Sequence, residues 1–261
     1  LSHGTDVYLG NAETLIKNGT CTLKEVIGCR DDIMVYLIEK GLPNKDAFDI
    51  MECVRKGKSP AVFPEKKYEE LMKKYNVPQW YIDSCKKIKY MFPKAHAAAY
   101  MIATLRLGWY KVHKPLEYYA AYFTVRGEDF DGATVILGKE AVKRKMQEIT
   151  MKGKEATKKE EDMYATFQIA NEMLARGIEV LPVDLYKSDA VKYLVEDGKI
   201  RLPFASLSGV GDAAAQSLAA ARETGGEYIS IDDLQARSKV SKTVIEMLQQ
   251  AGALKGLPES S

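Results

Sequence analysis

The chain has 261 residues, 46% of them apolar, and a net charge of +2, so it can bury the cores of two modest domains. No apolar run approaches membrane-spanning length and no signal peptide opens the chain, which favours a cytoplasmic protein without a membrane partner. The four cysteines form no CxxC pair and have no partnered histidines, a spacing that fits neither a zinc site nor a disulfide framework and favours reduced thiols.

The first half of the sequence predicts short helices separated by glycine and proline. Thr22 and Glu25 have the spacing of a capping box and predict a helical turn that Gly28 ends. Glycine, asparagine and proline signals, together with apolar spacing, predict further helices. Their ranges are about 30–40, 44–56, 65–74, 79–90 and 97–111, with a tyrosine-rich helix from Pro115 to Phe123.

The second half predicts a mixture of helices and one hairpin. Residues 139–177 are charged and periodic, which predicts two helices broken near Gly153. Asp197 and Gly198 form an Asp-Gly pair between two apolar runs, which is a strong signal for a β-hairpin. Residues 204–257 then return to short helices.

The clearest local motif is Leu207–Ala215, in which a Gly-Val-Gly turn opens an alanine-rich helix. Glycines let the backbone approach a phosphate closely, and the amide groups at the start of the helix favour an anion. The motif resembles the helix-hairpin-helix motif, which holds the DNA backbone without selecting sequence. The alternative is an ordinary tight turn between packed helices.

A second unit follows, with a helix over 231–237, a turn over 238–241 and a helix over 242–250. Its turn lacks the glycines of the first unit. The sequence therefore leaves two interpretations equally open, a second DNA-binding hairpin and a packing partner for the first one.

Residues 55–94 form a basic segment, with eleven Lys or Arg residues against four acidic ones, a local excess of seven positive charges. Such a segment favours contact with a polyanion, although a solvated helix surface would carry the same charge. A guanidinium suits phosphate as a planar fork, whereas a lysine acts as a point charge. Arg30 precedes this segment, and the sequence alone favours its pairing with the neighbouring Asp31 or Asp32.

The segment ends in a basic corner that carries rings, formed by Phe92, Lys94, His96 and Tyr100. His96 and Tyr100 are four residues apart, so their rings share one face of the predicted helix. The small residues Ala97–Ala99 between them allow another chain or a base pair to lie close. Such a corner can hold a base by stacking and a phosphate by charge. The alternative is tight helix packing with His96 hydrogen-bonded in a core.

Two catalytic patterns do not fit. Gly57–Ser59 imitates the end of a P-loop, but the pattern requires glycine at the position that Glu52 occupies. His3 and Asp6 lie three residues apart, yet no serine or cysteine has the context of a hydrolytic triad.

Several segments together resemble the family C replicative DNA polymerases of bacteria, most closely the PolC-type polymerase III alpha subunit of Gram-positive bacteria. The resemblance covers almost the whole chain, and its longest block, Trp80–Tyr100, is highly specific. The other blocks are Ser2–Val7, Gly28–Met34, Val54–Lys58 and Tyr122–Arg126. Because the first residue is Leu1 rather than methionine, we expect the chain to be a C-terminal fragment of such a protein.

The resemblance implies a mainly α fold with three parts. A polymerase fingers domain is expected over 1–150, connecting helices and a β-hairpin over 151–203, and a tandem helix-hairpin-helix domain over 204–261. The boundary between the two halves is expected within 127–190.

The resemblance also implies roles for individual residues in a DNA-directed DNA polymerase, a nucleotidyltransferase. The fingers would close over the incoming dNTP and its template partner. Residues expected to bind the triphosphate are Arg30, Arg55, Lys56 and Lys58. Residues expected to line the pocket of the nascent base pair are His3, Phe92, Lys94, His96 and Tyr100. Residues expected to contact the DNA backbone are Gly209, Gly211 and Ala213.

The magnesium ions of the family are held by aspartates of the palm, which is expected to precede Leu1. The resemblance therefore implies no metal ligand and no catalytic residue in this chain, and no polymerase activity by the chain alone. It implies primer-template DNA and dNTP as partners, and a sliding clamp and clamp-loader subunits through the full-length protein. The chain ends in Leu257–Ser261 without the glutamine-led clamp-binding peptide, so clamp binding by this chain itself is not expected.

Two other functions remain possible from the residues alone. A non-enzymatic, sequence-independent DNA-binding module would use the same basic segment and hairpins to hold duplex DNA. A helix-hairpin-helix base-excision glycosylase would need a catalytic aspartate facing a base-sized pocket, and Asp212 lies within the hairpin-helix junction, where it is misplaced for that chemistry.

Overall fold

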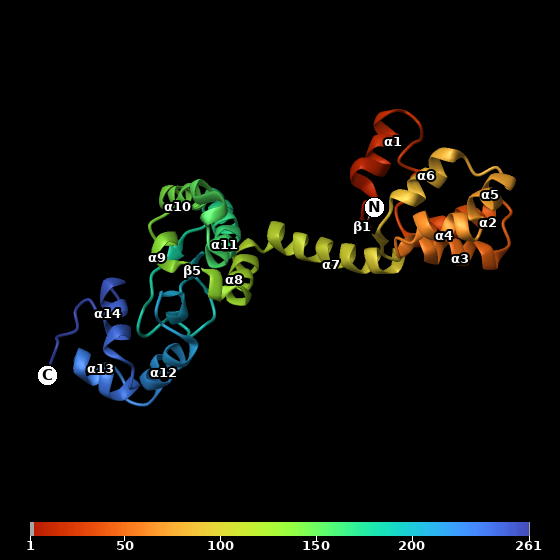
Figure 1. Cartoon of the computed structure of the whole chain (residues 1–261). Coiled ribbons are helices and arrows are strands. Elements are labelled where there is room, and N and C mark those ends of the chain that lie inside the picture. Colours follow the sequence, from red (N-terminus) through yellow and green to blue (C-terminus); the bar gives the residue numbers. More distant parts are fainter. Residues whose placement is uncertain (1–2, 261) are drawn as a thin grey trace. The chain divides into compact units, whose positions relative to one another are not determined.

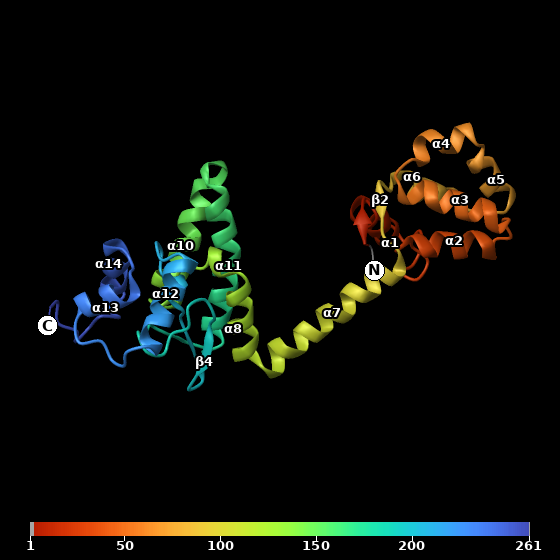
Figure 2. The same ribbon diagram turned by 90° about the horizontal axis from the view of Figure 1, so that it is seen from below.

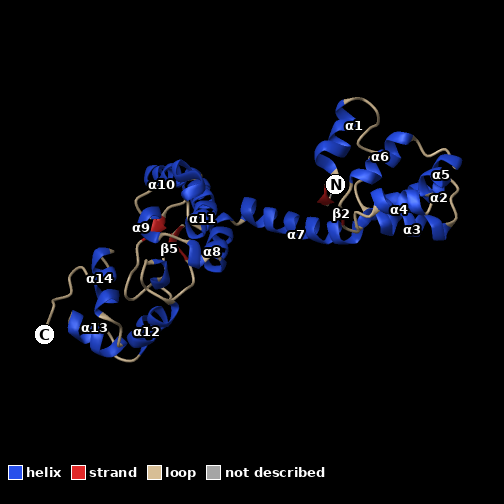
Figure 3. Cartoon of the chain, viewed as in Figure 1, coloured by secondary structure: helices blue, strands red, loops and turns tan. Residues whose placement is uncertain are grey.

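The computed structural model describes residues 3–260, and the chain divides into two compact units, Leu1–Arg106 and Leu107–Ser261 (Figure 1). Helices dominate both units, and the strands are short (Figure 3). The predicted mainly α fold class is therefore confirmed. The boundary between the units falls within α7 (Lys94–His113), whereas the predicted domain ranges 1–150, 151–203 and 204–261 stay a prediction.

Unit 1 is built from short helices around one core. Its elements are η1 (Tyr8–Ala12), α1 (Glu13–Lys17), α2 (Arg30–Glu39), α3 (Asn44–Arg55), α4 (Ser59–Glu65), α5 (Tyr68–Lys74), α6 (Gln79–Lys87) and the start of α7. Helices α2 and α3 pack side by side (Figure 2). The buried core includes Ile33 and Leu37 of α2, Ile50 of α3, Phe63 of α4 and Tyr81 of α6.

A carboxylate of α2 accepts hydrogen bonds from the backbone amide groups that directly precede the helix. Asp32 Oδ2 accepts hydrogen bonds from the backbone N of Gly28 at 3.1 Å and of Cys29 at 3.0 Å. These contacts satisfy donors that have no partner within the helix. Gly41, with φ +98°, follows the helix end, so the predicted helix of about 30–40 is confirmed.

Three predicted helices differ in the structure. The helix predicted over 65–74 begins only at Tyr68, as α5, because Lys67 before it is left-handed with φ +52°, and α4, which ends at Glu65, was not predicted. The predicted helix 79–90 ends at Lys87, because Ile88 is extended and the next residues form a strand. Glu25 Oε2 accepts from Thr22 N at 2.8 Å and from Thr22 Oγ1 at 2.7 Å, so one half of the predicted capping box forms, but the two residues close a turn rather than a helix.

The two-residue strands β1 (Gly4–Thr5) and β2 (Tyr90–Met91) join the beginning of unit 1 to the segment that precedes α7. They pair antiparallel, with Gly4 opposite Met91 and Thr5 opposite Tyr90. The sequence did not predict this pairing, since two-residue strands carry no periodic pattern.

Unit 2 begins with a helical part that packs around aromatic residues. After the end of α7 come α8 (Pro115–Val125), η2 (Gly127–Asp129), α9 (Gly132–Val135), α10 (Lys139–Lys152), η3 (Gly153–Glu155) and α11 (Lys158–Ala175). Helices α10 and α11 lie side by side (Figures 1 and 2) and confirm the two helices predicted around Gly153. Phe123, Phe167 and Phe204 are fully buried in this core.

A three-stranded sheet in unit 2 contains the predicted hairpin. Its order is β3 (Val180–Leu181), β5 (Lys199–Arg201), β4 (Leu194–Glu196), with β4 and β5 antiparallel and β3 parallel to β5. Asp197 and Gly198 have φ of +50° and +75°, the left-handed pair that a two-residue hairpin turn requires. The hairpin prediction is confirmed, whereas β3 was not predicted.

The chain continues through η4 (Phe204–Ser206), α12 (Asp212–Glu223), α13 (Ile231–Ser238) and α14 (Lys242–Gln250). The last two helices match the predicted ranges to within one residue. Leu218, Leu234 and Leu248, one from each of α12 to α14, are buried in the core of unit 2.

Helix α7 has 20 residues, and none of them is buried. Tyr100, Met101 and Leu105 are among its exposed large apolar side chains. Within residues 3–260 no helix is both long and apolar enough to cross a bilayer.

Candidate functional site

Three of the four residues predicted to bind a triphosphate meet at one carboxylate in unit 1, that of Glu52. Arg55 donates to it through Nε at 2.6 Å and Nη2 at 3.0 Å. Lys56 Nζ lies 3.0 Å from Oε2, and Arg30 Nη1 lies 3.7 Å from Oε1. These four residues, Arg30, Glu52, Arg55 and Lys56, are called the Glu52 cluster below.

Helix geometry explains how the Glu52 cluster forms. Arg55, the last residue of α3, and Lys56, which caps the end of that helix, follow Glu52 by three and four residues, the spacings at which side chains on a helix meet. Arg30 is the first residue of α2, and α2 packs against α3. The ion pair expected between Arg30 and Asp31 or Asp32 is corrected, because Arg30 pairs with Glu52.

The Glu52 cluster holds more positive than negative charge. Hydrogen bonds from the Arg55 guanidinium, followed by that from Lys56, lower the pKa of Glu52 to about 2, so the carboxylate is ionised at neutral pH. One anion thus faces three cations. The side chains remain accessible, with exposed fractions of 34% for Arg30, 23% for Arg55 and 47% for Lys56. The cluster can therefore accept a further anion.

The fourth predicted triphosphate residue, Lys58, is exposed and immediately precedes α4. It follows Gly57, whose φ is +69°. A Cβ at Gly57 would approach the backbone oxygen of Lys89 to 2.3 Å, so only glycine fits there. The turn that carries the basic residues therefore lies directly on the segment that leads into β2.

Four of the five residues predicted for the base-pair pocket lie together at the start of α7. The ring centroids of His3 and Phe92 are 4.6 Å apart, those of Phe92 and His96 4.7 Å, and those of His96 and Tyr100 4.6 Å. The Phe92 and His96 rings are stacked, with 21° between their planes. His3, Phe92, His96 and Tyr100 are called the ring corner below.

The pairing of β1 with β2 brings His3 to the ring corner. Phe92 N donates to His3 O at 2.9 Å, next to the β1–β2 pairs. A Cβ at Gly4 would approach the backbone oxygen of Tyr90 to 2.1 Å, so the close pairing requires glycine. Arg30 N donates to Phe92 O at 3.3 Å, which joins α2 to the same segment.

The fifth residue, Lys94, is held by two aspartates of α2. Its Nζ lies 3.3 Å from Asp32 Oδ1, and its backbone N donates to Asp31 Oδ2 at 2.6 Å. Lys94 therefore fixes the start of α7 on α2, and part of its charge is already neutralised. His96 does not have the hydrogen bond expected of a core histidine, because its Nδ1 is buried without a partner among the described residues.

The predicted DNA-binding turn of unit 2 adopts the conformation that its glycines allow. Gly209 has φ +87°, and Gly211 precedes α12 with φ −74° and ψ 164°. A Cβ at Gly211 would meet nothing within 4 Å, so the space in front of it is open. Ala213, in the first turn of α12, is exposed. The element before this turn is the single 3-10 turn η4 rather than an α-helix.

The second turn of unit 2 repeats this backbone without glycine. Lys239 occupies the left-handed position with φ +57°, and Ser241 precedes α14 with φ −70° and ψ 160°. Ser241 Oγ caps α14 by accepting from Val244 N at 3.3 Å. Met247 of α14 lies 3.7 Å from the Cβ position of Gly209, so the helix that follows the second turn packs against the first turn. Both interpretations of the second unit stay predictions.

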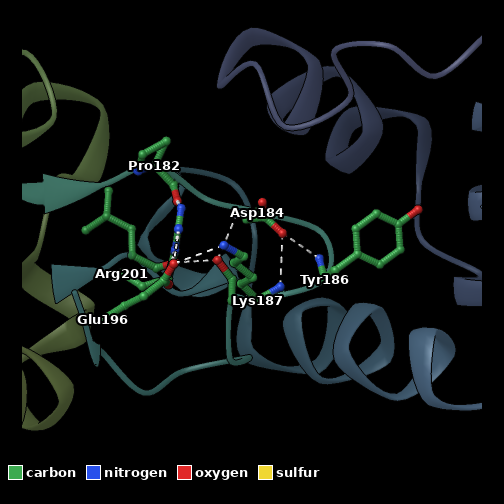
Figure 4. Close-up of polar contacts among 8 residues, drawn as sticks. Pro182, Asp184, Tyr186, Lys187, Glu196 and Arg201 are labelled. Carbon is green, nitrogen blue, oxygen red and sulfur yellow. Dashed lines mark hydrogen bonds and ion pairs between the residues drawn. The ribbon is translucent and has the colours of Figure 1, made fainter. Parts of the chain in front are cut away.

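Unit 2 contains another carboxylate that meets two cations (Figure 4). Glu196 accepts from Arg201 Nε at 2.7 Å and Nη2 at 2.6 Å, and from Lys187 Nζ at 3.2 Å. The remaining nitrogen of the Arg201 guanidinium, Nη1, donates to Pro182 O at 2.9 Å. Glu196, Arg201 and Lys187 are called the Glu196 cluster below. The sequence analysis assigned no function to it.

The resemblance implied magnesium ligands in the palm, before Leu1. Within residues 3–260, no group of three or more His, Cys, Asp or Glu side chains lies close enough together to hold a metal ion. All four cysteines are buried and free, and burial raises the pKa of Cys29 to about 11.

The member of the Glu52 cluster that sequence reasoning missed is Glu52 itself. It was considered only as the residue that breaks a P-loop pattern, although its spacing from Arg55 and Lys56 on a predicted helix was a usable signal. The contact of Gly57 with Lys89 had no such signal, because it joins segments that are distant in sequence.

Two family models match the sequence. The model of the bacterial DNA polymerase III alpha subunit finger domain matches residues 1–76, which include the Glu52 cluster. The model of the helix-hairpin-helix motif matches residues 177–261, which include both turns described above.

Curated relatives match over the full chain. The proteins named DNA polymerase III PolC-type of Listeria welshimeri, Bacillus subtilis and Caldanaerobacter subterraneus are 54%, 53% and 52% identical to it over 261 residues. Each match covers 100% of this chain and 18% of the relative, so the chain spans less than a fifth of the length of these relatives. The chain therefore belongs to the PolC-type DNA polymerase III family.

Proposed function

We propose that this chain is the part of a cytoplasmic replicative DNA-directed DNA polymerase that binds the incoming dNTP, the nascent base pair and the duplex backbone. The fingers bind the nucleotide, and the first helix-hairpin-helix turn holds the DNA behind it. Magnesium is held by residues outside this chain and supplies the metal assistance to phosphoryl transfer. The sliding clamp and clamp-loader subunits are partners of the full-length protein.

The Glu52 cluster is the observation that carries this proposal. Its three cations share one carboxylate, so two positive charges are left over, and exposed Lys58 adds a third nearby in sequence. Catalysis of phosphoryl transfer rests on positioned cations that stabilise the negative charge of the triphosphate. An accessible group of guanidinium and ammonium donors with excess charge supplies that requirement.

The ring corner supports the second part of the proposal. Tyr100 is 61% exposed, while the three rings beside it hold one another by edge and stacking contacts. Ala98 and Ala99 are exposed on the same helix and leave room for a flat ligand. A base pair can stack on such a surface, since every base has an aromatic face.

The first turn of unit 2 supports the duplex contact. The open space at Gly211 and the exposed Ala213 let a phosphate approach the amide groups at the start of α12. Such contacts position DNA without reading its sequence, as a replicative enzyme requires.

The test is steady-state incorporation by the full-length polymerase with Arg55→Ala and Arg30→Ala. Each variant loses a cation that faces the triphosphate, so we expect kcat/KM for the correct dNTP to fall about 100-fold. Lys17→Ala is the matched control, because it removes a cation from an exposed ion pair with Glu13 that lies outside the predicted site. Unchanged incorporation by both arginine variants would contradict the proposed triphosphate role.

Nucleotide dependence separates this function from that of a non-enzymatic DNA-binding module. Proteolytic protection of the segment around α3 and α4 should increase when primer, template and the correct dNTP are all present. A module that only holds duplex would be protected equally with and without the nucleotide.

A further inference from the structure

Glu52 is the only acidic residue that contacts three of the predicted triphosphate cations, among the residues that the structure describes. We propose that Glu52 is a positioning residue for nucleotide incorporation: it orients Arg30, Arg55 and Lys56 toward the triphosphate, and it lowers the affinity of the site for the unreacted nucleotide. This inference rests on the proposed function of the cluster.

The geometry of Arg55 carries the orienting role. Its Nε and Nη2 contact the two oxygens of Glu52, which fixes the plane of the guanidinium. A guanidinium has five N–H donors, and this fork uses two of them. The donors that remain are held in a defined plane for a ligand, whereas a free arginine side chain would have to lose its rotamer freedom when the ligand binds.

Glu52 itself is firmly placed. Its neighbours Met51 and Cys53 in α3 are buried, and the exposed fraction of its own side chain is only 22%. It also joins two helices, because Arg30 belongs to α2, Arg55 is the last residue of α3 and Lys56 directly follows α3. The carboxylate thus fixes the cations relative to each other as well as to the backbone.

The charge of Glu52 is the basis of its second role, which is to lower the affinity of the site for the unreacted nucleotide. With Glu52 ionised, the cluster has two excess positive charges, and replacing Glu52 by glutamine would leave three. A more positive site binds a triphosphate more tightly before any reaction has occurred, and such uniform binding does not raise kcat. Loss of the carboxylate should therefore tighten binding of the nucleotide while the reaction itself slows, because the cations are no longer oriented.

A local structural role is the competing explanation. Ion pairs at helical spacing stabilise a helix by about 0.3–0.5 kcal/mol each, and Glu52 makes two of them. If that were its whole function, Glu52→Gln would lower the melting temperature slightly and change neither kinetic constant of the folded enzyme.

The chain offers a matched control in Glu69. Like Glu52, this carboxylate contacts more than one cation. Its partners are Lys73 at 3.0 Å and Lys86, and the exposed fraction of its side chain is 26%. Contacts with Lys86 and Lys73 lower its pKa to about 2, as for Glu52. None of its partners is a predicted site residue. Glu69→Gln therefore makes the same charge change in the same unit, outside the site.

The experiment measures kcat and KM for the correct dNTP, with melting temperature, for the full-length polymerase carrying Glu52→Gln or Glu69→Gln. For Glu52→Gln we expect kcat to fall about tenfold because orientation is lost, and KM to fall because the site is more positive. For Glu69→Gln we expect both constants to stay within twofold of those of the unmodified enzyme, roughly the effect of a surface substitution.

Three outcomes would overturn the inference. These are unchanged kcat in Glu52→Gln, an unchanged or raised KM in that variant, or the same loss of kcat in both glutamine variants. Arg55→Ala separates this failure from failure of the proposed function. If Arg55→Ala reduces incorporation and Glu52→Gln does not, only the positioning role fails. If Arg55→Ala has no effect, the triphosphate role of the whole cluster fails.

Discussion

The Glu52 cluster of unit 1 and the Glu196 cluster of unit 2 use the same interaction in different ways. In each, one carboxylate accepts a fork from an arginine and a further contact from a lysine. The Arg201 side chain is only 8% exposed, and its remaining guanidinium nitrogen donates a hydrogen bond to Pro182 O (Figure 4). The Glu52 cluster has a third cation and remains accessible.

The difference between the clusters gives a criterion for deciding whether an ion pair has a structural or a binding role. A buried guanidinium with a partner on every nitrogen has nothing left for a ligand, so its removal should cost stability. A cluster with excess charge and accessible donors is not fully satisfied within the chain, so its removal should cost binding. Substitutions in and around the two clusters test this contrast.

The largest effect is expected where the backbone holds the Glu52 cluster in place. Gly57→Ala adds a Cβ that meets the backbone oxygen of Lys89 at 2.3 Å, in a left-handed conformation with φ +69°. We expect strain and overpacking together to cost about 3 kcal/mol in the free energy of unfolding. Denaturant unfolding of the chain measures this cost.

Gly19→Ala is its control, because Gly19 has the same φ of +69° and open space around its Cβ position. This variant should lose only about 1 kcal/mol from backbone strain. Equal losses in the two variants would show that the contact with Lys89 does not constrain the turn.

The next effect separates the two arginines. Arg201→Ala removes a buried group with three nitrogen contacts, and we expect the free energy of unfolding to fall by about 3 kcal/mol. Arg55→Ala removes a more accessible side chain and should cost less than about 1 kcal/mol. Thermal or denaturant unfolding of both variants gives the comparison, and a larger stability loss for Arg55→Ala would reverse the assignment.

Acid should weaken both clusters, since each lowers the pKa of its carboxylate to about 2 from an ordinary value of 4.5. A lowered pKa in the folded state contributes stability above pH 4.5, and that contribution disappears as the pH falls toward 2. Glu52→Gln and Glu196→Gln should each lose less stability than the unmodified chain over this range. Unfolding curves at several pH values test this, and slopes identical to that of the unmodified chain would contradict it.

The smallest effect concerns the two lysines. Lys56→Ala and Lys187→Ala each remove one exposed ion pair, so each should change the free energy of unfolding by less than about 0.5 kcal/mol. In the full-length polymerase, however, only Lys56→Ala should weaken dNTP binding. Equal dNTP affinities for the two variants would remove the functional distinction between the clusters.

Sequence reasoning predicted the elements whose signals are local. The Asp197-Gly198 turn and the helices on both sides of Lys239 were predicted closely, because caps, turns and apolar spacing lie within the elements themselves. The pairing of Gly4 with Met91 was not predicted, since each strand has two residues and the partners are distant in the sequence. Lys67 carries no glycine or asparagine signal for its left-handed conformation.

The candidate site was predicted only in part, because some of its contacts join residues that are distant in the sequence. Resemblance supplied the cations and rings, and the structure brings Arg30, Arg55 and Lys56 together and gathers four of the five pocket residues. Packing of α2 against α3 decides the partner of Arg30, and no sequence pattern reports on that packing. The neighbours Asp31 and Asp32 were therefore the natural but incorrect choice for Arg30.

The most direct test is the structure of the full-length polymerase with primer, template and the correct dNTP. We expect nitrogen atoms of Arg30, Arg55 and Lys56 to lie within about 3.2 Å of triphosphate oxygens. We also expect the Arg55 fork on Glu52 to be retained in this complex. The opposite result would be a triphosphate bound elsewhere while these side chains face solvent, and it would contradict the assignment of the Glu52 cluster.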